Sequence, residues 1–383
     1  MSPSAPQAPR PPSPQALHRI LIVRMSALGD IVHALPVLAA LRRAWPAVKV
    51  DWIVDEAYAS ILSLAEGLHQ SVIVRAKSGN PSTFARGASA DKKGLPPRFG
   101  GGAGYLQAVR YLRSQKYDVA LDLQGLLKSA VWARLSGARR VIGFDRAHLR
   151  EPMAAAFYSE TVVPLEAPHV IQKNLSILKA LGLPPAAVEL PLHPVAAVAT
   201  GDAIAAAGGS RKYAVLNPGA AWPNKRWPAE RFGALAAQLR ARTGLHSLVT
   251  WGPNERELAQ RVIAASAGAA IAAPPTEIAD LAVIMRDAAL VVSGDTGPLH
   301  IAAAMGTPLV GLYGPTWPER NGPWDERDQV ISRAGGCVCH HKRQCLRGAP
   351  CINEIEVTEV VAAAERRLSM RRGGSSDPLG RES

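Results

Sequence analysis

The segment 288–315 constrains the fold of this chain more than any other. It begins with an apolar run at 288–292, whose length and β-branched content are typical of a buried parallel strand. The polar turn 293–298 (S-G-D-T-G-P) interrupts this run, and we expect a short helix over 299–305 and a second strand over 308–313. Because backbone N–H groups at a helix N-terminus have no partner within the helix, this turn predicts an anion-binding site.

The same alternation of apolar strands and amphipathic helices runs through both halves of the chain. It predicts an α/β fold of two Rossmann-like, doubly wound domains, and 383 residues exceed what one core usually serves. Expected strands in the first half lie at 19–23, 49–54, 71–74, 118–123 and 141–144, with a helix over 31–44. Expected elements of the second half include strands at 213–217 and 247–251 and helices at 228–243, 278–287 and 357–370.

The domain boundaries follow from composition. We expect a disordered tail at 1–17, an N-terminal domain at 18–185, a linker at 186–212, a C-terminal domain at 213–355, a helix at 356–370 that packs back on the N-terminal domain, and a disordered tail at 371–383. No uncharged apolar stretch approaches the roughly 18 residues of a membrane span. Residues 1–15 lack the apolar core of a signal peptide, so we expect a cytoplasmic protein.

Positive charge is concentrated in the first half. The net charge is +13, and residues 1–190 hold 23 Lys and Arg against 13 Asp and Glu. This half should therefore meet an anionic partner: a nucleic acid, a phosphorylated lipid or a membrane surface. No nucleic-acid-binding motif is present, so we expect no nucleic acid. The glycine-rich segment 77–104 carries five basic residues and one acid, and it predicts a long loop that is either functional or disordered.

Four segments resemble glycosyltransferase family 9, the ADP-heptose:lipopolysaccharide heptosyltransferases. They are I-L-I-V-R-M-S-A-L-G-D-I-V-H-A-L-P at 20–36, D-L-Q-G-L-L-K-S-A at 122–130, N-K-R-W-P at 224–228 and V-S-G-D-T-G-P-L-H at 292–300. The resemblance implies the GT-B architecture, in which an acceptor domain and a nucleotide-sugar domain face each other across a cleft. It also implies an inverting transfer of heptose to a lipid A that bears 3-deoxy-octulosonic acid (Kdo), without a catalytic metal.

The resemblance assigns catalytic roles to two residues. Asp30 would take the proton of the acceptor hydroxyl, since inverting displacement needs a carboxylate base; it could instead cap the helix that follows. Lys225 would stabilise the negative charge of the diphosphate leaving group, although an exposed loop lysine is the alternative. The neighbouring Ala220 and Ala221 stand where some relatives have hydroxyl residues, so phosphate contacts there must come from backbone N–H groups.

The remaining site residues fall into a donor set and an acceptor set. A carboxylate after the strand at 247–251 can bind ribose hydroxyls or simply favour the helix dipole. The expected donor site consists of Gly219, Glu255, Asp295, Thr296, Gly297 and His300. By resemblance Asp295 holds the transferred sugar and His300 lies near the phosphates. The expected acceptor contacts, which hold a phosphorylated glycolipid at the inner membrane, are Lys128, Arg86, Lys92 and Lys93.

All four cysteines lie within fifteen residues, at Cys337, Cys339, Cys345 and Cys351. Cytoplasmic cysteines grouped in this way bind metal more often than they form disulfides, so we expect a structural zinc or iron. The C-x-C pair is closer than usual zinc spacing, and free thiols are the alternative.

Other functions remain open from sequence. The sequence is also compatible with a family member that uses another nucleotide sugar, with a nucleotide-sugar epimerase of the same architecture, and with a nucleic-acid binder. A screen of nucleotide sugars for thermal stabilisation would separate these readings.

Overall fold

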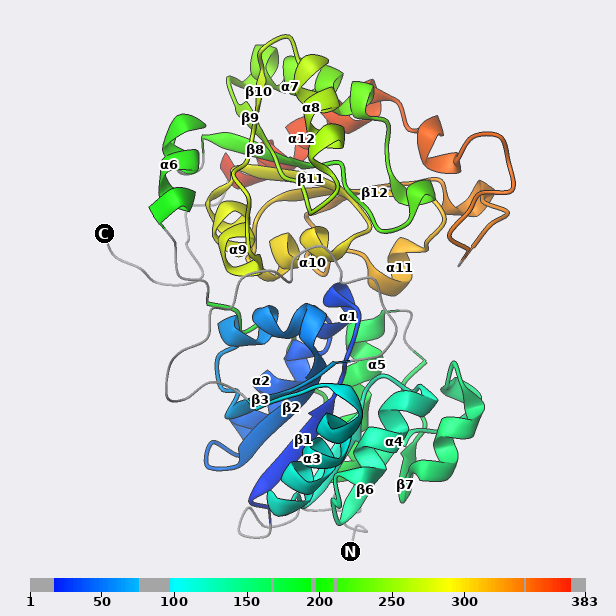
Figure 1. Cartoon of the computed structure of the whole chain (residues 1–383). Coiled ribbons are helices and arrows are strands. Elements are labelled where there is room, and N and C mark those ends of the chain that lie inside the picture. The colour runs from blue at the N-terminus through cyan, green and yellow to red at the C-terminus, as the bar shows by residue number, and fades with distance from the viewer. Residues whose placement is uncertain are drawn as a thin grey trace, which may run out of the picture. The chain divides into compact units, whose positions relative to one another are not determined.

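A computed structural model describes residues 17–75, 97–166, 169–193, 198–209, 212–340 and 342–372. The chain forms two compact units, the first up to His193 and the second from residue 194 onward (Figure 1). This boundary lies inside the segment expected to be the linker. No helix within the described ranges has the length and apolar character needed to span a bilayer.

The first unit is built on a seven-stranded sheet. Its order is β4-β3-β2-β1-β5-β6-β7, and every pairing is parallel. The strands are β1 (Arg19–Val23), β2 (Lys49–Asp55), β3 (Gln70–Val74), β4 (Arg98–Phe99), β5 (Val119–Asp122), β6 (Arg140–Phe144) and β7 (Glu160–Val162). The strand order reverses between β1 and β5, which makes this pair the switch point where open α/β sheets bind ligands.

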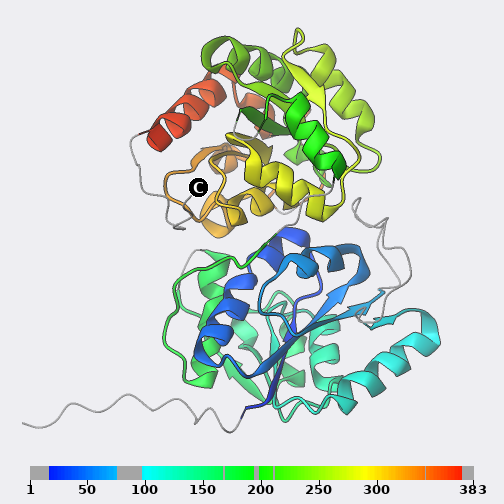
Figure 2. The ribbon, with the colours of Figure 1, turned by 90° about the vertical axis from the view of Figure 1, so that its left-hand side faces the viewer.

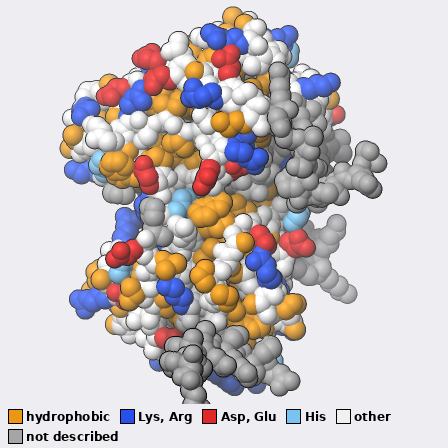
Figure 3. Space-filling view, turned by 180° about the vertical axis from the view of Figure 1, so that it is seen from behind, with side chains coloured by type: hydrophobic (Ala, Val, Ile, Leu, Met, Phe, Trp, Pro, Cys, Tyr) orange, Lys and Arg blue, Asp and Glu red, His pale blue; other side chains and the backbone are white. Residues whose placement is uncertain are grey.

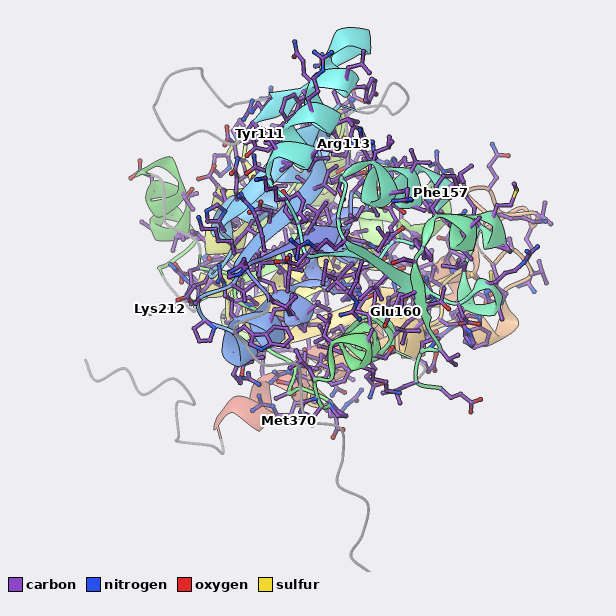
Figure 4. All side chains as sticks on the ribbon, turned by 90° about the horizontal axis from the view of Figure 1, so that it is seen from below. Tyr111, Arg113, Phe157, Glu160, Lys212 and Met370 are labelled. Atoms are coloured by element: carbon purple, nitrogen blue, oxygen red, sulfur yellow. The ribbon has the colours of Figure 1, made fainter. Side chains whose placement is uncertain are left out.

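Helices cover both faces of this sheet (Figure 2). Helices α3 (Gly101–Ser114) and α4 (Leu127–Leu135) pack together, and their buried residues share one core with β1, β3 and β5. Helix α2 (Leu35–Ala44) packs against α5 (Val170–Ser176). At one edge of the sheet, Arg140 of β6 and Glu160 of β7 form an ion pair of 2.7 Å, and Glu160 is labelled in Figure 4.

The second unit contains a six-stranded parallel sheet in the order β10-β9-β8-β11-β12-β13. Its strands are β8 (Tyr213–Asn217), β9 (His246–Val249), β10 (Ala270–Ala272), β11 (Leu290–Gly294), β12 (Leu309–Tyr313) and β13 (Gln329–Ser332). Helices α7 (Ala229–Thr243), α8 (Arg256–Ala264) and α12 (Val357–Arg372) form one layer. Helices α6 (Val198–Ala206), α9 (Ile278–Asp287) and α10 (Gly297–Ala304) form another. Here the switch point lies between β8 and β11.

The expected helix over 31–44 is wrong in one respect, because it consists of two helices. Helix α1 (Leu28–Val32) ends before α2 begins, and Pro36 is the second residue of α2. A continuous helix would need a backbone N–H at this position, which proline lacks; at the start of a new helix the missing donor costs nothing.

The C-terminal helix also differs from expectation. Val360, Val361, Ala363 and Ala364 of α12 are buried in the core of the second unit, and Arg367 bonds Asp328 at 2.7 Å. The expectation that this helix packs on the N-terminal domain is therefore wrong. Its apolar face is complementary to α7, β12 and β13, and the second unit would expose that core without it.

Candidate functional site

The polar residues of the second unit gather at the carboxyl edge of its sheet. Because all six strands run parallel, the segments that follow β8, β9 and β11 meet at one edge. Asn217, the last residue of β8, joins them: its amide donates to Ser293 Oγ at 3.0 Å and to Thr296 Oγ1 at 3.3 Å. Thr250 donates in turn to Asn217 Oδ1 at 3.2 Å. This buried network sets the positions of the loops at the switch point.

Asp295 is the centre of the site. Its side chain is only 3% exposed, and four side chains bond its two oxygens. Oδ2 accepts from Lys225 Nζ at 2.5 Å and from Thr316 Oγ1 at 2.7 Å. Oδ1 accepts from Asn321 Nδ2 at 2.8 Å and lies 3.3 Å from His300 Nε2. A carboxylate has about four acceptor positions, so this one is saturated by the protein.

The surroundings of Asp295 keep it ionised. Burial opposes ionisation, but the hydrogen bond from His300 and the charge of Lys225 outweigh it and hold the pKa of the carboxyl well below its usual range. The negative charge of Asp295 is therefore a permanent feature of the site at neutral pH.

Lys225 lies on the loop after β8, in the 3₁₀ turn Pro223–Lys225. Its ammonium is 4.9 Å from the centre of the Trp222 ring, as well as bonded to Asp295. The preceding residue, Asn224, is buried and donates to the carbonyl of Lys342 at 2.9 Å. The predicted lysine is therefore not a free surface residue, because both its head group and its loop are held.

Glu255 and Gly219 are brought into direct contact. Glu255 precedes α8, and its Oε2 accepts the N–H of Gly252 at 3.1 Å while Oε1 lies 3.4 Å from Arg226 Nη2. A Cβ at position 219 would lie 2.1 Å from Glu255 Oε2. A side chain at position 219 would therefore displace the Glu255 carboxylate from its present position. Thr296 and Gly297 stand at the start of α10, as expected, and His300 is buried within it.

Asp30 lies at the carboxyl edge of the first sheet, in α1 directly after β1. Its Oδ1 pairs with Arg24 Nη2 at 2.8 Å, and its Oδ2 accepts the N–H of Ala27 at 3.2 Å. The second contact is that of a capping box within α1, in which Ala27 is the N-cap and Asp30 the third helical residue, so Asp30 is not the N-cap of a helix that follows it. The side chain is 37% exposed, so capping does not remove it from solvent.

The expected acceptor residues are only partly described. Lys128 is exposed in the first turn of α4, just after β5 and thus at the same sheet edge as Asp30. Arg86, Lys92 and Lys93 lie outside the described residues. On the face shown in Figure 3, basic and acidic side chains are interspersed over the described surface.

The four cysteines lie close together in the structure. Cys339 Sγ lies 3.5 Å from Cys337 Sγ and 3.5 Å from Cys345 Sγ, and the free thiol of Cys351 is hydrogen-bonded to that of Cys337. Burial, with the neighbouring thiols, raises the pKa of Cys351 to about 12. Among the described residues, however, no group of three or more Cys, His, Asp or Glu has an arrangement that could hold a metal ion. The geometry therefore gives no support to the expected zinc or iron.

Sequence reasoning missed four residues of these clusters. Thr316 and Asn321 bond Asp295, and Arg24 and Gln124 hold the loop of Asp30. Three of them follow strand ends, where a polar residue after an apolar run is a usable signal. Asn321 is the last residue of the short helix α11 (Pro318–Asn321), and nothing local distinguishes it.

Known proteins resemble the chain over most of its length. Lipopolysaccharide heptosyltransferase 1 of Pseudomonas aeruginosa is 29% identical over 329 residues, which cover 85% of this chain and 87% of the relative. The protein of the same name from Escherichia coli K12 is 29% identical and covers 82% and 93%. The solved structure of E. coli heptosyltransferase WaaC with ADP superposes with a TM-score of 0.70 at 25% identity, covering 91% of this chain and 99% of that one.

The fold and these relatives define a glycosyltransferase of the GT-B class, which confirms the predicted fold and enzyme class. The model of Glycosyltransferase family 9 (heptosyltransferase) matches residues 105–349. The chain belongs to this family.

Asp295→Asn should change how stability depends on pH. A carboxyl whose folded pKa is depressed stabilises the fold above its unfolded pKa of about 4, and this contribution is lost as pH falls below that value. In urea unfolding, the wild type should exceed the variant in stability by about 3 kcal/mol at pH 7, the scale of a broken buried pair. The difference should shrink progressively below pH 4. A difference that stays constant from pH 7 to pH 3 would contradict the ionised state of Asp295.

Proposed function

We propose that the protein is an inverting heptosyltransferase that moves heptose from ADP-heptose to the Kdo–lipid A inner core of lipopolysaccharide. Two kinds of observation support this activity. The relatives named above carry the name lipopolysaccharide heptosyltransferase 1, and the similar structure of E. coli WaaC was solved with ADP. The alternative donors are other nucleotide sugars, which the same site chemistry would accept.

The observation that carries the proposal is the Lys225–Asp295 pair at the β8/β11 switch point. A diphosphate leaving group gains negative charge as the glycosidic bond breaks, and a fixed ammonium stabilises that charge. Asp295 holds the ammonium of Lys225 at the edge of the sheet. Donor binding would then exchange part of this contact, so that Lys225 turns to the diphosphate and an oxygen of Asp295 becomes free for a hydroxyl of the sugar.

Asp30 is the proposed general base. Its carboxylate is partly exposed and stands at the switch point of the first sheet, where a bound acceptor would present its hydroxyl. Attack by that hydroxyl on the anomeric carbon forms the new glycosidic bond, expels ADP and passes the hydroxyl proton to Asp30. This step inverts the configuration and requires no metal or other cofactor.

The acceptor and the location of the enzyme complete the proposal. A phosphorylated glycolipid would contact the basic first half through Lys128 and through Arg86, Lys92 and Lys93 of the glycine-rich segment. Such an acceptor lies in a membrane. We therefore propose a cytoplasmic enzyme that associates peripherally with the inner membrane, on its cytoplasmic face. Electrostatic contact of exposed lysines with phosphate is weakened by salt.

Lys225→Met should remove the stabilisation of the leaving group. We expect kcat to fall by about 10²–10³, the usual loss for one electrostatic donor. The reason is that the negative charge on the diphosphate, which Lys225 stabilises, develops in the transition state. Steady-state kinetics with ADP-heptose and a Kdo–lipid A acceptor would measure this fall. Arg261→Met is the control, since Arg261 is an exposed basic residue of α8 in the same unit and pairs with Glu230, which is not a donor-site residue. Equal losses in both variants would contradict the role of Lys225.

Asp30→Asn should keep donor binding and lower turnover by about 10²–10⁴, as expected when a general base is lost. Binding is read from thermal stabilisation by ADP-heptose, which adds about 2.7 kcal/mol at 100 times the dissociation constant. Stabilisation by ADP but not UDP sugars would also establish the donor. Near-normal turnover of Asp30→Asn would remove this residue from the mechanism.

A structural zinc or iron at the cysteines stays a prediction from sequence alone. Elemental analysis of protein purified without chelators should find about one equivalent, and Cys345→Ser should release it with donor affinity unchanged. Cys345 is the better choice for this test than Cys339, because Asn224 contacts Cys339 Sγ and adjoins Lys225. Metal-free protein with full activity would end the metal hypothesis.

A further inference from the structure

Arg24, the residue that follows β1, has a buried side chain that the reaction described so far does not use. Its side chain is 9% exposed. Nη1 donates to the carbonyl of Leu123 at 2.5 Å, and Nη2 pairs with Asp30 Oδ1 at 2.8 Å. The guanidinium therefore connects the segment after β5 with the carboxylate after β1, across the switch point of the sheet.

The loop between Arg24 and Asp30 is fixed at other points as well. Trp52 of β2 donates to the Arg24 carbonyl at 2.9 Å. Gln124 accepts the N–H of Met25 at 2.8 Å, and its amide nitrogen lies 3.3 Å from Ser26 Oγ. These hydrogen bonds hold the backbone of the loop independently of the Arg24 guanidinium. Within this loop and α1, the guanidinium itself contacts the carboxylate of Asp30.

The hydrogen bonds and the ion pair of the Arg24 guanidinium do not explain why this group is buried. Its Nε is buried and has no hydrogen-bond partner, and an unsatisfied buried N–H costs free energy. Among the described residues, its charge is paired only with Asp30, a carboxylate that is 37% exposed. A buried cation with an open donor and one partly exposed charged partner contributes little to stability.

We propose that Arg24 is a positioning residue for the general base. It holds Asp30 Oδ1 while Ala27 N–H holds Oδ2, so the carboxylate stays in one rotamer and presents its remaining lone pairs to the solvent side. This inference rests on the proposed role of Asp30. The planar, forked guanidinium suits the task because it reaches the Leu123 carbonyl and Asp30 together, whereas a lysine ammonium is a single point charge.

A positioning role predicts a specific kinetic pattern. Arg24→Met should lower kcat by about 10²-fold, the scale of a misplaced reactive group. The KM values for donor and acceptor should hardly change, since no substrate contact is lost. Arg24→Lys should recover part of kcat, because an ammonium can still reach Asp30. In the Asp30→Asn background, Arg24→Met should cause no further loss, because the base it orients is already absent.

Arg19→Met is the matched control. Arg19 opens the same strand, roughly 16 Å from Arg24 along it, and its Nε also pairs with a buried acid, Asp51, at 2.8 Å. Its replacement should lower the melting temperature at least as much as Arg24→Met does, because Asp51 is fully buried whereas Asp30 is partly exposed, and it should leave kcat unchanged. This comparison separates loss of stability from loss of positioning, and Arg24→Lys provides the measurement if Arg24→Met does not fold.

The outcomes are distinct. If Asp30→Asn is slow but Arg24→Met and Arg24→Lys keep full kcat, the positioning role is wrong and the base assignment stands. If the two losses multiply in the double variant, or if acceptor KM rises in Arg24→Lys while kcat holds, Arg24 acts independently of Asp30 and the inference is overturned. If Asp30→Asn is itself active, the base assignment fails first.

Discussion

The carboxyl edge of the second unit's sheet depends on the interactions of one buried charge, that of Asp295. Removing a carboxylate from water costs several kcal/mol unless other groups compensate it. Here the compensation comes from Lys225 after β8, His300 in α10, and Thr316 and Asn321 after β12. Three separate segments are therefore held to one side chain, which fixes the loops of the proposed donor site relative to one another.

The first unit also buries an acid, but neutral hydrogen-bond donors compensate it. Asp122 ends β5 and is fully buried; burial raises its pKa, and it accepts from Gln124 N–H, Gly125 N–H, Ser129 Oγ and Tyr158 Oη. These bonds fix the turn from which Gln124 and the Leu123 carbonyl reach the neighbouring loop. Asp122 is thus sealed inside the unit, whereas the carboxylate of Asp30 stays partly exposed. This difference in exposure is why the general base is proposed at Asp30 and not at Asp122.

The sequence predicted helices and strands well where a short run of neighbouring residues determines the element. Strands β1 and β8 and helix α9 have the expected bounds, since a short apolar run between polar turns determines its own conformation. The errors have other causes. Pro36 divided a helix whose apolar period continued across it, and α12 packs on the second unit because its partner surface is assembled from α7, β12 and β13.

The sequence by itself determined that both halves are parallel α/β sheets and that Asp30, Lys225 and Asp295 follow strand ends, because strand period and turn chemistry are written over a few neighbouring residues. Only the tertiary structure decided which of these groups meet. Lys225 and Asp295 are 70 residues apart and become partners because β8 and β11 are adjacent in the sheet. Likewise, Asn321 reaches Asp295 and Arg24 links Asp30 to the turn after β5. Such contacts depend on strand order, which is chosen by the packing of the whole unit and not by any local pattern.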